Sequence, residues 1–425
     1  MRVVTNCPLP PDLAARFVGD PIDAVTGAFF DDVQDFIVAS DELPIAWRRT
    51  YSTERIAEDR GLGRGHSHAF DHRLKLDLDG IRYTSPLGET VHFPSFHAAE
   101  TRVARSGHVL TRDGTRLSLE RPSGPGLVFD LLPSAHARLA EVRAVGRSIC
   151  VGYDFTGRLA SLGDTDGNVV SFTWDEEHIL SARVLARGAT AHVELVRYRY
   201  EGDLLVEVQD AYKHSLLYAY DDAGRLVRRT DRRGYSFSFE YDADGRCIHS
   251  AGDDGMLEVR LEYFPFELRT RVTKSDGGVW EYFYDSAKTL TKVVDPEGIE
   301  RSFVPRPEDG QIALEIDGAG NEIVSLYDDD GRRIGRRDAL GRPIAPRRGH
   351  PVPSTPAQYE LGRLATLPEE LPTRELLQYS LPPAIAGSLV LGSGAGEGRV
   401  REVRDVQGLL IREERDGLAR LQQEP

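Results

Sequence analysis

The sequence has little cysteine, little methionine and no long apolar run. Its 425 residues include 3 Cys and 2 Met. The cysteines, at positions 7, 150 and 247, are too few and too scattered for a disulfide framework or a four-ligand zinc site. The most apolar late stretch, residues 381–392, is only about a dozen residues long and contains two prolines, so it cannot span a bilayer of roughly 30 Å as a helix.

Positive charge is also in short supply. Lys and Arg total 53 against 68 Asp and Glu, which gives a formal net charge of −15 and argues against a nucleic-acid-binding surface. No charged and then apolar leader opens the sequence, so we expect no signal peptide. A nucleophile elbow, a phosphate loop and a dinucleotide fingerprint are likewise missing from the sequence. The sequence therefore predicts neither catalytic residues nor a bound cofactor.

Glycine, by contrast, is abundant at 41 residues, and it recurs in a pattern. Tyr220-Asp221 and Tyr241-Asp242 lie 21 residues apart, and each opens an Asp-x-x-Gly turn. In such a turn the carboxylate accepts backbone N–H groups, and the glycine takes a positive φ. The stretch between turns, residues 235–241, alternates apolar and polar side chains as a strand does. A period near 20 predicts stacked β-hairpins rather than a compact enzyme core.

The repeat can be followed along much of the chain by its aromatic residue. The equivalent positions are Tyr153, Trp174, Tyr200, Tyr220, Tyr241, Tyr263, Tyr284, Phe303 and Tyr327. The turn-forming residues predicted from the pattern are Asp154, Gly157, Asp221, Gly224, Asp231, Gly234, Asp242, Gly245, Asp295, Gly298, Asp317, Gly320, Asp328, Gly331, Asp338 and Gly341. We therefore predict an all-β fold.

The unit Tyr-Asp-x-x-Gly-Arg-Leu resembles the YD repeat of the Rhs and teneurin-like family, whose repeats spiral into a hollow β-shell. The residues ahead of the repeats support this resemblance. Residues 19–27 begin Gly-Asp-Pro and end Thr-Gly, residues 43–52 carry Leu-Pro followed by Arg-x-Tyr-Ser, and residues 61–71 carry Leu-Gly-x-Gly and then Asp. His66 stands where family members usually have Trp.

On this basis we divide the chain into five parts. Residues 1–18 are a lead-in, 19–149 an opening β region, and 150–342 the repeat shell. Residues 343–398 are rich in Pro and Gly and predict an irregular or helical excursion, or a plug of the shell. Residues 399–425 resume the repeat and stop within it, since the Asp-x-x-Gly pattern returns at Asp405.

One cluster offers an enzymatic alternative. His66, His68, Asp71 and His72 come within one inserted residue of the His-x-His-x-Asp-His arrangement of binuclear metallohydrolases. The extra residue changes the directions in which Asp71 and His72 point. We favour a structural role for these four residues and keep the hydrolase as an alternative.

The resemblance implies a non-enzymatic shell that encloses a toxin domain of a bacterial polymorphic toxin, exported by a type VI secretion machine or a related injection apparatus. Its partners would be a continuing or separate Rhs polypeptide with the toxin, and a secretion spike or a chaperone. The protein would stay in the bacterial cytoplasm before export and then be secreted or delivered to a target cell. A surface adhesion or glycan-binding YD-repeat protein is the remaining alternative.

Overall fold

The computed structural model describes residues 15–40, 43–97, 100–134 and 136–344, and the backbone of 401–404, 410–415 and 418–421. The predicted excursion at 343–398 lies outside the described residues except for its first two positions. Three 3-10 helices interrupt the strands: η1 (Thr53–Arg55), η2 (Asp253–Gly255) and η3 (Pro265–Glu267). Within the described ranges, the helical segments are too short and too polar to traverse a lipid bilayer.

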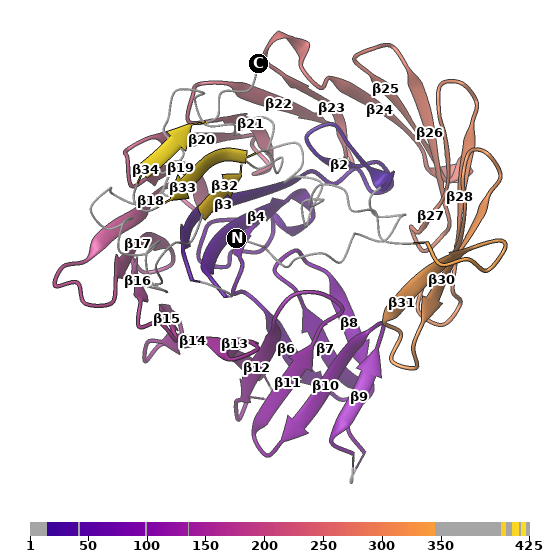
Figure 1. The fold of residues 1–425 in the computed structure, drawn as a ribbon. Helices are drawn as coiled ribbons and strands as arrows, with labels where there is room; N and C mark the ends of the chain where they lie inside the picture. The colour runs from indigo at the N-terminus through magenta and orange to yellow at the C-terminus, as the bar shows by residue number, and fades with distance from the viewer. Residues whose placement is uncertain are drawn as a thin grey trace.

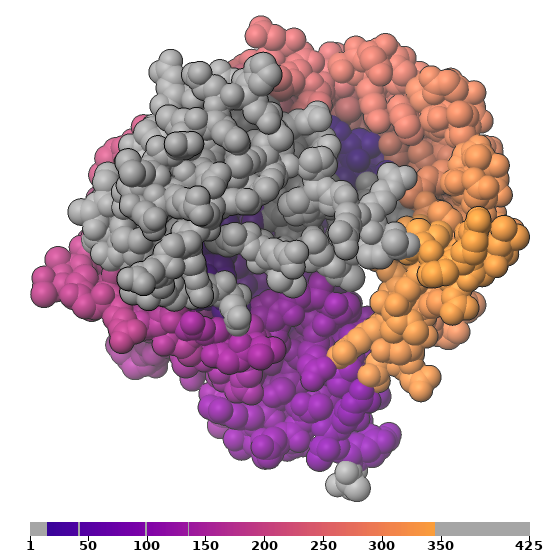
Figure 2. Space-filling view, viewed as in Figure 1, coloured from indigo at the N-terminus to yellow at the C-terminus, as the bar shows by residue number. Residues whose placement is uncertain are grey.

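Strands β6–β31 form one curved antiparallel sheet, in which β13 pairs with both β6 and β14, and we call this sheet the wall. Figure 1 shows it curving around the N-terminal strands, and Figure 2 shows the indigo N-terminal atoms inside the ring. The prediction of an all-β fold is confirmed. The early wall strands are β6 (Arg73–Asp77), β7 (Gly80–Thr84), β8 (Thr90–Phe93), β9 (Arg102–Arg105), β10 (His108–Asp113), β11 (Arg116–Glu120), β12 (Gly126–Leu131) and β13 (His136–Ala144).

The repeats continue the same sheet, each strand pairing with the next in sequence. Their strands are β14 (Arg147–Tyr153), β15 (Leu159–Asp164), β16 (Val169–Trp174), β17 (Ile179–Leu185), β18 (Val193–Glu201), β19 (Leu204–Asp210), β20 (Ser215–Tyr220), β21 (Leu226–Thr230), β22 (Ser236–Tyr241), β23 (Cys247–Gly252), β24 (Val259–Phe264), β25 (Arg269–Lys274), β26 (Val279–Tyr284), β27 (Leu290–Val294), β28 (Glu300–Pro305), β29 (Ile312–Ile316), β30 (Glu322–Tyr327) and β31 (Arg333–Asp338).

The sheet does not break at the expected boundary between residues 149 and 150, because β14 spans it. It forks one strand earlier, at β13. The first residues of β13 pair with β6 through Ala137 and Leu74, and its last residues pair with β14 through Val142 and Ile149. Part of the opening region therefore belongs to the wall, and the repeats are a continuation of it.

Each predicted Asp-x-x-Gly turn has the same hydrogen bonds. In the turn at Asp221, Oδ1 accepts the N–H of Ala223 at 3.0 Å and that of Arg225 at 2.8 Å, and the Gly224 N–H donates to the Asp221 carbonyl. Gly224 has φ of 80°. Oδ1 makes the same pair of bonds at Asp154, Asp231, Asp242, Asp295, Asp317, Asp328 and Asp338. The aspartates thus close the turns that separate the wall strands.

The other residues of the motif join one repeat to the next. The Tyr241 hydroxyl donates to the Leu226 carbonyl of the preceding repeat at 2.6 Å, and the guanidinium of Arg225 lies over the Tyr241 ring at 4.9 Å. Arg225 Nε also donates to Asp221 at 2.8 Å. The same stacking joins Arg158 to Trp174, Arg246 to Tyr263 and Arg306 to Tyr327. The Tyr, Asp, Arg and Leu positions of the motif therefore form one contact that passes along the wall.

A second sheet lies inside the wall. It consists of β3 (Phe30–Val38), β4 (Ile45–Ser52) and β5 (His66–His68), and we call it the inner sheet. A two-stranded sheet of β1 (Phe17–Val18) and β2 (Ile22–Asp23) precedes it. Trp47 and Tyr51 of the inner sheet are fully buried. Its side chains complete the apolar core against the concave face of the wall.

Three further strands form a separate sheet, β32 (Arg401–Arg404), β33 (Leu410–Arg415) and β34 (Leu418–Leu421). Its first hairpin carries a register shift between Val403 and Arg404. The hairpin at Tyr220 has the same shift one residue before its turn, between Ala219 and Tyr220. The pairing of residues 401–404 with 410–414 therefore resembles that of a wall hairpin.

The turn geometry gives a direct test with a matched control. Gly234 has φ of 88° and Gly163 has no positive φ, while a Cβ at either position would meet no atom within 4 Å. We expect Gly234→Ala to lower the free energy of unfolding by about 1–2 kcal/mol through backbone strain alone. Gly163→Ala should leave it unchanged or raise it. Urea denaturation followed by tryptophan fluorescence measures both, and equal effects would contradict the assigned turn.

Candidate functional site

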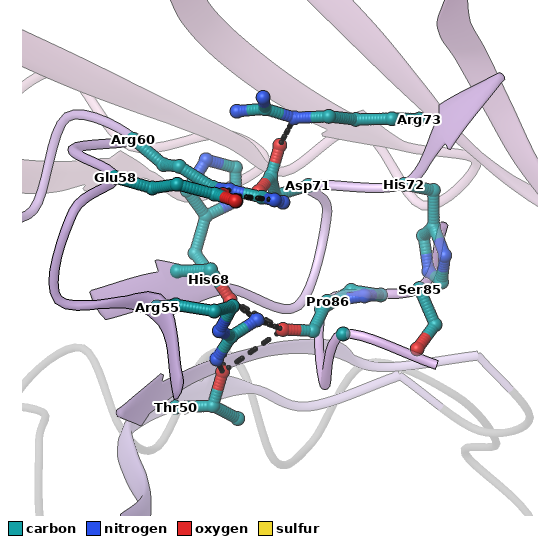
Figure 3. Close-up of polar contacts among 12 residues, drawn as sticks. Thr50, Arg55, Glu58, Arg60, His68, Asp71, His72, Arg73, Ser85 and Pro86 are labelled. Carbon is teal, nitrogen blue, oxygen red and sulfur yellow. Dashed lines mark hydrogen bonds and ion pairs between the residues drawn. The ribbon is translucent and has the colours of Figure 1, made fainter. Parts of the chain in front are cut away.

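Three residues of the possible metal site, His68, Asp71 and His72, lie near the fork of the wall (Figure 3). His66 lies between Arg49 and Tyr220, with Nδ1 3.4 Å from Arg49 Nη1 and Nε2 3.0 Å from the Tyr220 hydroxyl. His68 stacks on Trp47 at 4.6 Å between ring centroids. Each of these histidines is engaged by the core around it rather than by the other.

Asp71 and His72 point to further partners. Asp71 binds Arg60 at 2.7 Å and Arg73 at 2.8 Å, and the His72 Nδ1 lies 2.8 Å from the Tyr83 hydroxyl. A cation placed at Asp71 would meet two guanidinium groups. Across the described part of the chain, no three His, Cys, Asp or Glu side chains are placed to hold a metal ion. The geometry therefore does not fit the binuclear hydrolase arrangement.

Burial accounts for the state of these histidines. It lowers the pKa of His66 and of His72 well below the ordinary value, and the neighbouring charges of Arg49 and Arg121 lower it further. Burial also lowers the pKa of His68 to about 4. Neutral histidine at neutral pH suits a core position. With Nδ1 accepting from Arg49, His66 donates from Nε2 to the Tyr220 oxygen.

A pocket of about 300 Å³ lies in the fork, where β6 and β14 separate along β13. Its lining includes Trp174, Tyr153 and four arginines against a single carboxylate, that of Asp71. The arginines are Arg60, Arg73, Arg138 and Arg158. Several are already paired, since Arg158 Nε donates to Asp154 at 3.1 Å and Arg138 lies over the Tyr153 ring at 4.4 Å. The pocket is a basic recess within an acidic chain.

Arg55 ties the inner sheet to the early wall in the same region (Figure 3). It donates to the Thr50 hydroxyl and to the carbonyl of Pro86, in the turn between β7 and β8. The Ser67 hydroxyl donates to the same carbonyl at 2.5 Å. Burial, reinforced by the charge of Arg60, lowers the pKa of Arg55 to about 10. A buried cation is thus held here by neutral oxygens.

The strongest candidate for a functional element is the contact between the inner sheet and the wall. A chain of buried hydrogen bonds crosses it repeatedly. Trp47 Nε1 donates to the Tyr198 hydroxyl at 2.8 Å, and that hydroxyl donates to Asp35 at 2.7 Å. Asp35 also accepts two bonds from Arg49 at 3.2 Å each. Arg49 then donates to the Tyr218 hydroxyl at 2.9 Å.

The chain of bonds ends at a wall arginine. The Tyr218 hydroxyl donates to Asp31 at 2.9 Å, and Arg229 donates to Asp31 at 2.5 Å and to Asp20 at 2.6 Å. Tyr198, Tyr218 and Arg229 belong to wall strands β18, β20 and β21, while Asp31 belongs to the inner sheet. The network therefore fixes how the inner sheet sits within the wall.

The electrostatics of the network favour ionised partners. Burial alone would lower the pKa of Arg229, but the carboxylates of Asp20 and Asp31 outweigh it and raise that pKa. The pKa of Arg49 is raised in the same way, with Asp35 as the main opposing charge. Each guanidinium is held charged by carboxylates within its reach, which is the condition that a buried ion pair must meet.

The glycine-containing motif at residues 61–65 makes further backbone contacts with the wall. The Gly61 carbonyl accepts the Ile179 N–H at 2.8 Å, and the Arg64 N–H donates to the Asp203 carbonyl at 2.9 Å. Gly61 has φ of 87°, and a Cβ there would lie 2.5 Å from the Trp174 ring. A side chain at position 61 would therefore push the motif away from the wall.

Sequence reasoning missed this network. Asp20 and Arg49 entered only as the Asp of Gly-Asp-Pro and the Arg of Arg-x-Tyr-Ser, with no partner assigned to either. Asp31, Asp35 and Arg229 were not singled out, although all five residues are buried. Beyond the two motifs, the sequence held a signal for Arg229. The turn at Asp231 sets a register that places Arg229 opposite Phe237, on the apolar face of the hairpin. The predicted turn residues, in contrast, are distributed along the wall and do not converge on one site.

Comparisons with known proteins fit this layout. A family described as "Domain of unknown function (DUF6531)" matches residues 19–93, and one described as "RHS Repeat" matches residues 220–255. The first region contains the inner sheet and the second contains Arg225, Arg229 and Tyr241. The two matches therefore fall on the two sides of the buried network.

Two curated relatives share long alignments with the chain. It is 26% identical over 344 residues to a protein named "Probable deoxyribonuclease RhsB" from Dickeya dadantii, covering 73% of this chain and 23% of the relative. It is 27% identical over 271 residues to "Probable deoxyribonuclease RhsA" from the same organism, covering 61% and 18% respectively. The chain thus spans about a quarter or less of the length of these relatives.

Other similarities are shorter or weaker. A segment of 101 residues is 28% identical to "tRNA nuclease WapA" of Bacillus subtilis, covering 24% of this chain and 4% of the relative. Among solved structures, the crystal structure of TcdB2-TccC3 matches with a TM-score of 0.36 and 11% identity, over 61% of this chain and 16% of that one.

Removal of the wall arginine tests the network. We expect Arg229→Met to cost about 3–5 kcal/mol of unfolding free energy, because it leaves the buried Asp31 carboxylate without its guanidinium partner. Arg228, its neighbour on the outer face, is exposed and serves as the control. Arg228→Met should change stability by no more than about 0.5 kcal/mol. Denaturant titration measures the free energy of unfolding of both variants. Equal losses of that free energy in the two variants would refute the role of Arg229.

The buried histidines predict the direction of a pH dependence. His68 has a folded pKa of about 4 against 6.5 for the ordinary group, so below pH 6.5 the unfolded chain binds a proton that the folded chain does not. Stability should therefore fall as pH drops from 6.5 to about 4, by up to about 3 kcal/mol for His68. His68→Gln should flatten this slope, while a substitution of the exposed His136 by Gln should not. Identical slopes in wild type and His68→Gln would contradict the assignment.

Proposed function

Because this chain is an Rhs, or YD-repeat, protein, we propose that it forms a non-enzymatic section of a protein shell that encloses a toxin domain. The observation that carries the proposal is the buried network from Trp47 to Arg229, which holds a curved wall closed around an inner sheet. A wall held in this way from its concave side acts as a container.

The relatives suggest what such a container would hold. Those named above carry nuclease names, and a further relative is named "Double-stranded DNA deaminase toxin A" from Burkholderia cenocepacia. The chain matches only 23% of the first of these. We assign the toxic activity to a part of a longer polypeptide that lies outside the matched region. This chain would keep that part shielded in the producing cell.

Delivery follows from the same proposal. The shell would remain in the bacterial cytoplasm until export by a type VI secretion machine or a related injection apparatus. Its partners would be the polypeptide that carries the toxin and a spike or chaperone protein of the exporting machine. Nucleic acid is not among the proposed partners of the wall itself, given the net charge of −15.

Contacts of the repeat aromatics argue against the glycan-binding alternative. Sugar recognition would need an open ring face. In the repeats of Trp174, Tyr241 and Tyr263 an arginine from the neighbouring repeat already lies over the ring. The polar tips of the same rings donate to backbone carbonyls. These aromatics are therefore occupied by the wall.

Protease protection of the full-length gene product tests the container. We expect its toxin region to survive limited proteolysis when the wall is intact. Arg229→Met should expose that region, because the inner sheet loses its anchor, whereas Arg228→Met should not. Intact-mass spectrometry of the digests identifies the protected fragments. A toxin region cleaved equally fast in the wild type and in Arg229→Met would refute the proposed enclosure.

A further inference from the structure

The two ends of the wall meet at turns. The turn between β9 and β10, at Ser106-Gly107, contacts the turn between β30 and β31, at 328–332. The Gly107 N–H donates to the Asp330 carbonyl at 2.7 Å, and Arg332 Nε donates to the Gly107 carbonyl at 3.3 Å. Figure 1 shows β31 beside β9 and β10, and in Figure 2 the orange end of the wall reaches the purple strands. We call this contact the seam.

Side chains add ion pairs across the seam. Arg102 Nη2 lies 2.5 Å from Asp330 Oδ2, and Arg332 Nη2 lies 2.7 Å from Glu120 Oε2. Arg105 also donates to the Glu308 carbonyl, in the turn between β28 and β29, at 2.7 Å. Two late turns, between β28 and β29 and between β30 and β31, therefore contact the early wall. These contacts join residues more than 200 positions apart in sequence.

The seam is closely fitted at its centre. Gly107 and Gly331 both have positive φ, at 77° and 78°. A Cβ on Gly107 would lie 3.1 Å from the Gly331 carbonyl oxygen, and one on Gly331 would lie 3.1 Å from the Gly107 nitrogen. The two backbones thus approach to contact distance, and a side chain at either position would wedge the turns apart.

The seam is nevertheless a weaker joint than the rest of the wall. Neighbouring strands are held by ladders, such as the one that pairs β30 with β31 from Ile323 to Tyr327. The seam pairs are exposed, with side-chain accessibilities of 52% and 24% for Arg102 and Asp330. Exposed ion pairs contribute about 0–1 kcal/mol each and weaken in salt. A ladder of backbone bonds between buried strands is not screened in this way.

From this difference we infer that the seam is the place where the wall opens, with β28–β31 moving away from β9–β11 while the ladders stay intact. Within the described residues, β31 pairs with β30 along a ladder and with Pro343 through an isolated bridge at Arg337. A backbone ladder joins this section to the preceding wall strand, β27, whereas its turns contact β9–β11 through polar groups. Such a section can move as a flap when the polar contacts break. The inference that the seam opens follows from these contacts and does not depend on the proposed function. The passage of an enclosed polypeptide through it rests on the proposed function.

One amide reports the opening directly. The Gly107 N–H is bonded across the seam, whereas the Gly245 N–H is bonded within its own turn to Asp242. Hydrogen exchange with single-residue mass-spectrometric resolution compares the two. Raising NaCl from 0.05 M to 1 M should speed exchange at Gly107 by about tenfold and leave Gly245 unchanged, because salt screens exposed pairs over a few ångströms. This measurement uses the unmodified chain and does not depend on any variant folding.

Charge exchange provides the second arm. Asp330→Arg should speed Gly107 exchange at low salt by repelling Arg102, and Arg102→Asp combined with Asp330→Arg should restore slow exchange. Asp130→Arg, which breaks the exposed Arg116–Asp130 pair within a ladder, is the control and should leave Gly107 unchanged. Gly107 exchange insensitive to salt, or accelerated together with Gly245, would overturn the inference. Neither outcome would bear on enclosure of a toxin, which the protease assay tests separately.

Discussion

The structure depends on the buried hydrogen-bonded chain that joins the inner sheet to the wall. Carboxylates alternate along it with guanidinium or phenol groups. It runs from Asp35 and Arg49 of the inner sheet to Tyr218 of the wall, returns to Asp31 of the inner sheet and continues to Arg229 of the wall. Breaking such a chain leaves a buried charge without its partner, which costs more than the bond itself contributes. The network therefore holds the inner sheet in one position and orientation against the wall. It also constrains the curvature of the wall strands that face the inner sheet.

The wall is stabilised differently from the buried network, because each repeat is joined mainly to its neighbours. The Asp closes a turn, the Arg that follows the Gly bridges that Asp and the next aromatic ring, and the ring hydroxyl returns to a backbone carbonyl. These contacts are local and repeat along the sheet. Besides the pairing of β13 with β6, two long-range features complete the wall, the inner network and the seam. They have opposite characters, since one is buried and the other is exposed to solvent and salt.

The sequence predicted the parts that repeat and missed those that do not. Turns such as the one at Asp221 follow from local chemistry, so the all-β hairpin array could be read from its period. The division between 149 and 150 differs from the observed sheet, because pairing of β13 with β6 joins residues far apart in sequence. Arg49 stands in the Arg-x-Tyr-Ser motif, but the motif does not reveal its pairing with Asp35, which depends on the register between β3 and β4. The histidines near position 70 resembled a metal site in spacing, but the fold directs them to different neighbours.

The central claim is that the inner sheet and the concave wall form one cooperative unit through the buried network. Native-state hydrogen exchange at increasing denaturant concentration tests it most directly. The account predicts that amides of β4 and of β20 and β21 merge into one opening reaction with the same free energy and the same denaturant dependence. Exchange of β4 amides through a separate opening, several-fold easier than that of β20 and β21, would show that the inner sheet leaves the wall independently and would contradict the claim.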